Sequence, residues 1–151
     1  MAEARPTPRG DDRPIAEELT ALLAGRLPGI LGMRVLEASP DRIVGEMPVT
    51  ERLLAPNGYL HAATVVALAD TACGLGTRLS LPETASGFTT VELKTKYLGT
   101  ARSGVISAVA VPVHRGGRTQ VWDATVLDES GRTIALFRCT QLLISSERTT
   151  S

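Results

Sequence analysis

The pattern of hydrophobic and polar residues is dominated by one stretch, residues 61–77, in which nearly every side chain is small or apolar. Asp70 is the one acidic residue inside it. A segment of this length without a polar stripe predicts a helix that is covered on all sides. Asp70 is then a candidate buried carboxylate, which either has hydrogen-bond partners that satisfy it or is poised for chemistry.

Two elements precede this helix. The apolar residues that recur at helical spacing near the start of the chain are Ile15, Leu19, Leu22 and Leu23. They predict a short amphipathic helix that ends near Pro28 and Gly29. Residues 33–37 and 42–49 have the composition of two strands around a turn at 39–41, so a hairpin leads toward the central helix.

Four further strand-like segments follow the central helix, at residues 88–98, 104–113, 119–127 and 132–144. The first of them alternates, with one face formed by Thr89, Val91, Leu93, Thr95 and Tyr97. About six strands with one long helix after the second predict an α+β fold, in which an antiparallel sheet curls around the helix.

The chain of 151 residues fits a single domain. Residues 1–14 contain three prolines and charges of both signs with little that is apolar, which is typical of a disordered tail. We expect one domain over residues 15–145 and a polar tail over residues 146–151. The sequence shows no internal repeat.

The charge balance argues against several partners. With 16 basic and 16 acidic residues the formal net charge is zero, so no global field attracts nucleic acid or an anionic membrane. The chain has no long apolar run and no apolar N-terminal signal, so we expect a cytoplasmic protein without a membrane partner. Cys73 and Cys139 are isolated thiols without metal-ligand spacing, which predicts packing roles, no metal site and no cofactor.

The start of the central helix is a candidate site for an electrophile. Asn57 and Gly58 predict a turn before it, which leaves the N–H groups of Ala62 and Ala63 free at the positive end of the helix dipole. Such groups can polarise a carbonyl oxygen that becomes an oxyanion. Asp70 lies roughly 12 Å from Ala62 along the axis, too far for both to reach one carbon. Two antiparallel helices in a homodimer would join the two halves.

Both halves also have a structural interpretation, which the sequence leaves open. Asp70 can be a satisfied structural acid, and the helix start can simply satisfy its own caps. Gly74 and Gly76 lie late in the helix and not between a strand and a helix start, so they indicate helix packing and not dinucleotide binding. The motifs of serine hydrolases, P-loop enzymes and common metalloenzymes are absent from the sequence.

Residues 58–63, Gly-Tyr-Leu-His-Ala-Ala, followed by Asp70 nine residues after His61, resemble the G-x-x-H-G-G motif and helical acid of the hotdog-fold acyl-CoA thioesterases. The branch in question contains the phenylacetate-degradation and Arthrobacter-type 4-hydroxybenzoyl-CoA thioesterases. The resemblance extends over about residues 32–144 and implies the hotdog fold, a sheet wrapped around one helix. It implies hydrolysis of an aryl-CoA or medium-chain acyl-CoA thioester by a homodimer that pairs into a homotetramer.

The resemblance also implies a role for each matching residue. Asp70 attacks the thioester carbonyl or activates water for that attack, and Ala62 donates its N–H to the carbonyl oxygen. Thr90, with Thr89 beside it, matches a polar residue that positions the water. His61 is expected to be a structural hydrogen-bonding residue at the helix start, because the carboxylate already serves as base.

Two positions depart from the family pattern. Ala62-Ala63 replaces Gly-Gly, which preserves the N–H donors but adds two methyl groups where the thioester approaches. Ala55 stands where relatives often carry Asn or Gln as an extra contact to the thioester, and Asn57 is the nearby residue that could substitute. The residues expected to line the substrate site around the helix start are Asn57, Gly58, His61 and Ala63.

Coenzyme A brings phosphate groups, which local cations can bind despite the zero net charge. The predicted turn at residues 114–118 combines Arg115 and Arg118 with the flexible backbone of Gly116 and Gly117, as a phosphate contact needs. In relatives this hairpin and the region of Arg102 approach the nucleotide. The alternative is a solvated hairpin tip with ordinary surface charge.

Two other functions stay open. A non-catalytic acyl-CoA binding or sensing protein would keep the pocket and the cations without requiring Asp70. A hotdog dehydratase or hydratase needs a His base paired with an acid, and that pair is not evident at the required spacing. Only 3% of the residues are aromatic, and the aliphatic strand faces fit aryl and alkyl groups alike, so the sequence does not identify the acyl group.

Overall fold

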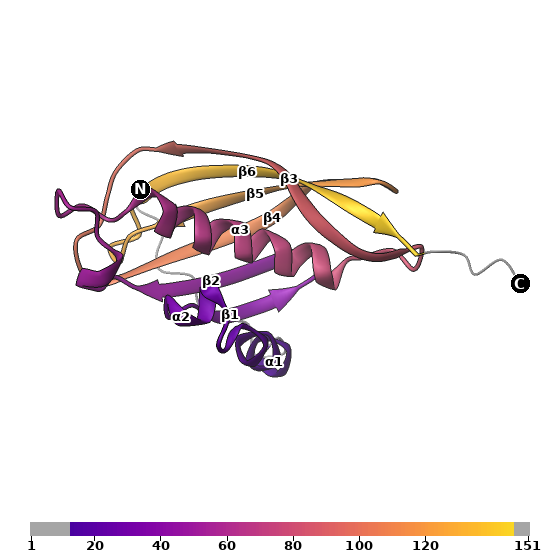
Figure 1. Cartoon of the computed structure of the whole chain (residues 1–151), viewed down its shortest axis with the longest axis horizontal. Coiled ribbons are helices and arrows are strands. Elements are labelled where there is room, and N and C mark those ends of the chain that lie inside the picture. Colours follow the sequence, from indigo (N-terminus) through magenta and orange to yellow (C-terminus); the bar gives the residue numbers. More distant parts are fainter. Residues whose placement is uncertain (1–12, 147–151) are drawn as a thin grey trace, which may run out of the picture.

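The structure, a computed structural model, describes residues 13–146 (Figure 1). Its elements in chain order are α1 (Arg13–Leu23), α2 (Leu27–Ile30), β1 (Arg34–Ser39), β2 (Arg42–Pro48), the 3-10 turn η2 (Glu51–Leu53), α3 (Ala62–Leu79), β3 (Ala85–Tyr97), β4 (Val105–Arg115), β5 (Thr119–Leu127) and β6 (Thr133–Ser145). The predicted hairpin, central helix and four following strands are all present. The two predicted tails lie outside the described residues, except for Ser146 and for Arg13 and Pro14, which belong to α1.

The six strands form one antiparallel sheet in the order β1-β2-β4-β5-β6-β3. The sheet curls around α3, while α1 lies beside β1 at one edge of the sheet (Figure 1). This arrangement confirms the predicted α+β architecture and the hotdog fold that the resemblance implied.

Small residues let α3 approach the sheet closely. Ala108 and Ala110 on β4 and Ala135 on β6 are fully buried. Trp122 on β5, the largest fully buried side chain, lies against Gly76 of α3, where a Cβ atom would be 2.3 Å from the indole. The close packing of α3 against the sheet at this point therefore depends on a glycine in the helix.

The expectation that α3 is covered on all sides is wrong for the single chain. Between Thr64 and Thr77 of α3, the residues that are only partly buried are Val66, Ala67, Asp70, Thr71 and Gly74. They share one side of the helix, because they recur at three- and four-residue spacing. Asp70 therefore lies on a side of α3 that the described residues of the chain leave partly open.

The predicted N-terminal helix is divided into two. α1 ends at Leu23, and Gly25 adopts a left-handed φ of +72°, a conformation that ends a helix. Ile15 and Leu22 were expected on the buried face but are 39% and 48% exposed. The residues of α1 that are buried are Ala16, Leu19 and Leu23. None of the helices within residues 13–146 is long and apolar enough to cross a membrane.

The two edges of the sheet differ. At the β1 edge, Thr20 of α1 accepts a hydrogen bond from the Val35 N–H at 2.9 Å, so α1 lies against this strand and provides a partner for one of its N–H groups. β3 forms the other edge over 13 residues, and none of the described strands pairs with its outer side. Val91 and Leu93 of β3 are 55% and 43% exposed. A long unpaired edge strand with exposed apolar residues is a template for another strand.

The predicted alternation of β3 is wrong in its first half. The register of β3 against β6 shifts just after Thr90, where a β-bulge inserts one residue. Thr90 lies opposite Gln141 and Leu93 lies opposite Cys139, and both of these β6 residues are fully buried. Residues directly opposite each other share a face of the sheet, so Thr90 and Leu93 both face α3. Thr89 consequently lies on the other face.

Candidate active site

The start of α3 has one free backbone donor. His61 is the N-cap residue, and its Nδ1 accepts a hydrogen bond from the Ala63 N–H at 2.9 Å. This confirms the structural role predicted for His61, and it corrects the expectation that the Ala63 N–H is free. The Ala62 N–H has no hydrogen-bond partner among residues 13–146. Because Ala62 is also exposed, it is the donor available to a ligand at the positive end of α3.

The turn before α3 uses Asn57 to shape itself. Gly58 adopts φ +82°, and its N–H donates to the Ala55 carbonyl at 2.8 Å. The Asn57 Oδ1 accepts a hydrogen bond from the Tyr59 N–H at 3.2 Å. The predicted turn is therefore present, and the side-chain oxygen of Asn57 already has a partner within it.

Two tyrosines contact residues near the start of α3. Tyr97, at the end of β3, donates from its hydroxyl to the Ala62 carbonyl at 2.9 Å. Arg102 lies over the ring of Tyr59, 4.5 Å from its centroid, which places the predicted cation near the start of α3. Sequence reasoning assigned no role to Tyr97, because no local pattern connects it to a helix that starts 35 residues earlier.

Asp70 is held by a side chain from β3. The Thr90 hydroxyl lies 3.2 Å from Asp70 Oδ1 and 2.9 Å from Gln141 Oε1. Burial raises the pKa of the Asp70 carboxyl above its ordinary value, and the hydrogen bond from Thr90 partly offsets that effect. The structure thus brings together Asp70 and Thr90, as predicted, and adds Gln141. The signal for Gln141 was its position as an amide on a strand face whose other residues, Ala135, Phe137, Cys139 and Leu143, are apolar.

The structure does not bring every expected residue to this site. Thr89 is exposed and lies opposite Leu142, on the face of the sheet that points away from Asp70. Ala62 and Asp70 lie eight residues apart on the same straight helix, about 12 Å along its axis at 1.5 Å per residue. A single chain therefore presents the free N–H and the carboxylate as two separate halves.

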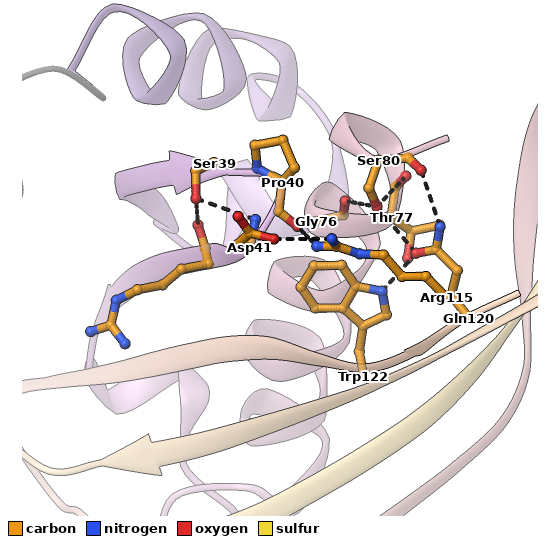
Figure 2. Close-up of polar contacts among 10 residues, drawn as sticks. Ser39, Pro40, Asp41, Gly76, Thr77, Ser80, Arg115, Gln120 and Trp122 are labelled. Atoms are coloured by element: carbon orange, nitrogen blue, oxygen red, sulfur yellow. Dashed lines mark hydrogen bonds and ion pairs between the residues drawn. The ribbon is translucent and has the colours of Figure 1, made fainter. Parts of the chain in front are cut away.

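Arg115 is engaged within the fold. Figure 2 shows its guanidinium pointing at the turn between β1 and β2, where it pairs with Asp41 at 3.0 Å and also contacts the Pro40 carbonyl. It lies 5.5 Å from the ring centroid of Trp122 as well. A phosphate group bound by Arg115 would have to share it with the Asp41 carboxylate.

The turn between β4 and β5 lies at the other end of α3. Figure 2 shows Ser80, the C-cap residue of α3, beside Gln120 of β5, and the two side chains lie 3.2 Å apart. The Gly116 N–H donates to the Thr119 carbonyl, so it is used within the turn, whereas Arg118 is exposed. The predicted cations therefore lie at opposite ends of α3, with Arg102 near its start and Arg118 beyond its end.

Comparisons with known proteins agree with this fold. The family model of the thioesterase superfamily matches residues 57–135, a span that includes the turn before α3, Asp70 and Thr90. The protein named "Putative esterase ComA2" from Bacillus subtilis is 36% identical over 114 residues, which cover 76% of this chain and 90% of that protein. The 1,4-dihydroxy-2-naphthoyl-CoA hydrolase of Listeria monocytogenes is 30% identical over 110 residues, which cover 73% of this chain and 89% of that protein.

Solved structures show the same architecture. The thioesterase HI1161 from Haemophilus influenzae superposes with a TM-score of 0.82 and 29% identity, covering 90% of this chain and 94% of that chain. The PaaI protein of Escherichia coli superposes with a TM-score of 0.78 and 21% identity, covering 89% of this chain and 96% of that chain. This similarity shows a shared fold. The matching family model, the relatives named as CoA hydrolases and the shared fold together define the class as a hotdog thioester hydrolase. The chain belongs to the thioesterase superfamily.

Proposed function

We propose that this protein hydrolyses an acyl-CoA thioester to the free acid and coenzyme A, with Asp70 as the catalytic carboxylate. The observation that carries the proposal is the position of Asp70: it lies on the open side of a helix that is otherwise apolar, and it accepts a hydrogen bond from Thr90. A carboxylate whose pKa burial raises remains a base strong enough for proton transfer.

The two halves of the site have complementary tasks. The Ala62 N–H and the helix dipole stabilise the negative charge that develops on the thioester oxygen. Asp70 either attacks the carbonyl carbon, so that the thiolate leaves and water hydrolyses the resulting anhydride, or takes a proton from the water that attacks. In both routes the C–S bond breaks and the free acid and thiol are released.

A homodimer would complete the site. Its support is the unequal protection of the sheet edges. α1 lies against β1, whereas no strand within residues 13–146 pairs with the outer side of β3, which exposes Val91 and Leu93. Two β3 strands paired antiparallel about a two-fold axis would join the sheets and set two α3 helices side by side. The Ala62 N–H of one protomer could then reach the Asp70 region of its partner, giving two equivalent sites. Further pairing into a homotetramer is part of the proposal.

The same two-fold symmetry would bring arginines of the two protomers close together. Arg102 lies at the start of α3 and Arg118 beyond its end, so antiparallel helices bring Arg102 of one protomer to the side of Arg118 of the other. Together these side chains could bind the phosphate groups of coenzyme A. The residues Asn57, Gly58, His61 and Ala63 would line the path of the thioester at the helix start.

The acyl group is proposed to be aromatic. The Listeria relative is named a hydrolase of 1,4-dihydroxy-2-naphthoyl-CoA, and a protein of Escherichia coli with the same name is 30% identical over 128 residues. A panel of aryl-CoA and medium-chain acyl-CoA thioesters at equal concentration would rank the substrates by kcat/KM. Alkyl substrates that are turned over at least tenfold better than every aryl substrate would contradict this part of the proposal.

The variant Asp70→Asn tests the function. Hydrolysis of the best substrate should fall by at least about a hundredfold in kcat, the lower end for loss of a general base, while acyl-CoA binding measured by calorimetry survives. The non-catalytic binding protein is the competing function, and it predicts no hydrolysis in the unaltered protein either. An Asp70→Asn variant that keeps wild-type turnover would refute the assignment of Asp70.

A further inference from the structure

We infer that Gln141 is a positioning residue that lets the hydrogen bond between Thr90 and Asp70 reverse its direction when Asp70 takes up a proton. This inference rests on the proposed function of Asp70. It concerns a fully buried side chain of β6 that lies opposite Thr90 and that is separated from Asp70 by one hydroxyl group.

When Asp70 is ionised, this cluster has too few hydrogen atoms for the Thr90 hydroxyl to bond both Asp70 and Gln141 in the observed orientation of the amide. Thr90 has a single hydroxyl hydrogen, yet its Oγ1 lies 3.2 Å from Asp70 Oδ1 and 2.9 Å from Gln141 Oε1. If Asp70 is ionised, both neighbours are acceptors, and one of them receives no hydrogen. A buried acceptor without a donor is unfavourable, so this arrangement suits a protonated Asp70.

The protonated state forms an unbroken chain. Asp70 donates to Thr90, Thr90 donates to the carbonyl oxygen of Gln141, and the Gln141 amide nitrogen donates to Cys139 Sγ at 3.4 Å. The ionised state forms an equally complete chain once the Gln141 amide turns by half a rotation. Its nitrogen then donates to Thr90, Thr90 donates to Asp70, and the Cys139 thiol can donate to the amide oxygen.

A reversible hydrogen-bond chain affects proton transfer to Asp70. A general base must accept a proton during the reaction, and a chain that reverses provides partners for the carboxylate before and after that step. Without the acceptor on Gln141, the Thr90 hydrogen has no partner when Asp70 is protonated. When Asp70 is ionised, loss of Gln141 leaves only a lone pair of Thr90 without a donor, because the Thr90 hydrogen stays with Asp70. An orphaned donor costs more than an unfilled lone pair, so loss of Gln141 weakens the protonated form of Asp70 more than the ionised form and makes Asp70 a stronger acid.

Other ionisable groups near the chain are few. Among the described residues, the titratable side chains that act on this cluster are Asp70, Cys73, Cys139 and Asp123. The hydrogen bond with the neighbouring Cys139 thiol, together with burial, raises the pKa of Cys73 well above its ordinary value, so the Cys73 thiol stays neutral where Asp70 titrates. Glu92 lies on the outer face of β3, where it accepts from Thr140. Asp70 is thus the group whose titration the chain follows.

The test measures the ionisation of Asp70 directly, by carbon NMR of protein labelled at the aspartate carboxyl carbons. The Asp70 signal is identified by its loss in Asp70→Asn. In Gln141→Met the ionisation constant of Asp70 should rise about 2- to 12-fold, the equivalent of one net hydrogen bond. The acid limb of kcat/KM should move to lower pH in parallel, with KM on the plateau within twofold of wild type. An unchanged ionisation constant overturns the inference.

Gln120→Met is the matched control. Gln120 lies directly opposite Gln141 on the neighbouring strand and is equally buried, but it bonds to Trp122 and Ser80 and not to Thr90. It should lower stability without moving the titration of Asp70. In a Thr90→Val background, Gln141→Met should also leave that titration unchanged, because the intermediate hydroxyl is gone. A shift that persists there would overturn the role assigned to Thr90.

A measurement on the unaltered protein covers the case in which Gln141→Met fails to fold. The side-chain amide NMR signals of Gln141 should titrate with the same midpoint as the Asp70 carboxyl carbon, and they should be independent of pH in Asp70→Asn. Amide signals that do not follow Asp70 overturn the inference. This outcome is distinct from failure of the proposed function, which would show as full turnover in Asp70→Asn.

Discussion

The α-carbon of Gly76 on α3 lies against the indole of Trp122 on β5, so closely that an added Cβ would be 2.3 Å from the ring. Gly74, two residues earlier, faces Phe88 instead, and an added Cβ would be 3.5 Å from that ring, an ordinary van der Waals contact. The two glycines of α3 therefore differ in whether they tolerate an added methyl group, although the sequence presents them as a pair.

Gly76→Ala is expected to destabilise the protein by about 1–3 kcal/mol, because overpacking against a fully buried Trp122 exceeds the gain in helix propensity. Gly74→Ala is the matched control and should be neutral or stabilise the fold by up to about 1 kcal/mol, since the methyl group fits. Urea denaturation of both variants compares them. Equal stabilities of the two variants would show that the contact with Trp122 is not decisive.

Asp70→Asn is expected to stabilise the protein at neutral pH. Burial raises the pKa of Asp70 in the folded state, so the folded protein holds this proton more tightly than the unfolded chain does. The stabilisation from that proton is present at acid pH and is lost as pH rises through the folded-state pKa. The Tm of Asp70→Asn should therefore exceed that of the wild type at pH 7, and the difference should shrink toward pH 4. A lower Tm at pH 7 would contradict it.

Ala62→Pro is expected to abolish activity while it preserves the helix. Ala62 is the first residue of α3, where proline is favourable, and His61 before it has the extended conformation that proline requires. The substitution removes the N–H that is free to bind the thioester oxygen. Loss of one such donor should lower kcat about 100- to 1,000-fold with little change in Tm. Wild-type turnover would exclude Ala62 as the donor.

Mixing the two inactive variants tests the shared site. If one protomer supplies the Ala62 N–H and the other supplies Asp70, a heterodimer of Ala62→Pro with Asp70→Asn contains one intact site and one doubly damaged site. Co-refolded mixtures should recover up to about a quarter of wild-type activity, because half of the random dimers are heterodimers with one working site out of two. Absence of any recovery in a mixture shown to contain heterodimers would place both groups of a site in one chain.

Arg118→Ala is expected to raise KM for a CoA thioester with kcat nearly constant, because a phosphate contact stabilises the ground state and the transition state alike. The increase should lie between about 10- and 150-fold at most and be smaller at high salt, since the side chain is exposed. A pantetheine thioester without the nucleotide should show no such change. Equal effects on both substrates would reject the phosphate role.

Arg115→Ala provides the contrast. Arg115 is predicted to bind phosphate like Arg118, but it also pairs with Asp41, whose side chain is 81% exposed. The ion pair itself contributes little, within about 1 kcal/mol, so a small loss of stability should accompany any rise in KM. Asp41→Asn separates the two effects: it should leave KM unchanged or lower it, because Arg115 is then free for the ligand.

The sequence alone was sufficient to predict the central helix, the order of the strands along the chain and the main candidate residues. The apolar stretch around Asp70 and the spacing from His61 predicted the central helix, its carboxylate and the family, because such signals are local and survive without knowledge of any contact. The strands and their turns followed for the same reason. Thr90 could be placed near Asp70 only through the resemblance, since its own strand pattern favoured Thr89 and its neighbours.

Tertiary structure decided which partners the candidate groups have. A bulge in β3 reversed the faces around Thr90, and pairing with β6 put Gln141 beside it, 51 residues away in sequence. His61 folded back onto the Ala63 N–H, which left Ala62 as the free donor. Arg115 pairs with Asp41, which lies 74 residues away in the sequence. Each outcome depends on strand register and on competition between side chains from distant segments, and hydrophobic periodicity carries no information about either.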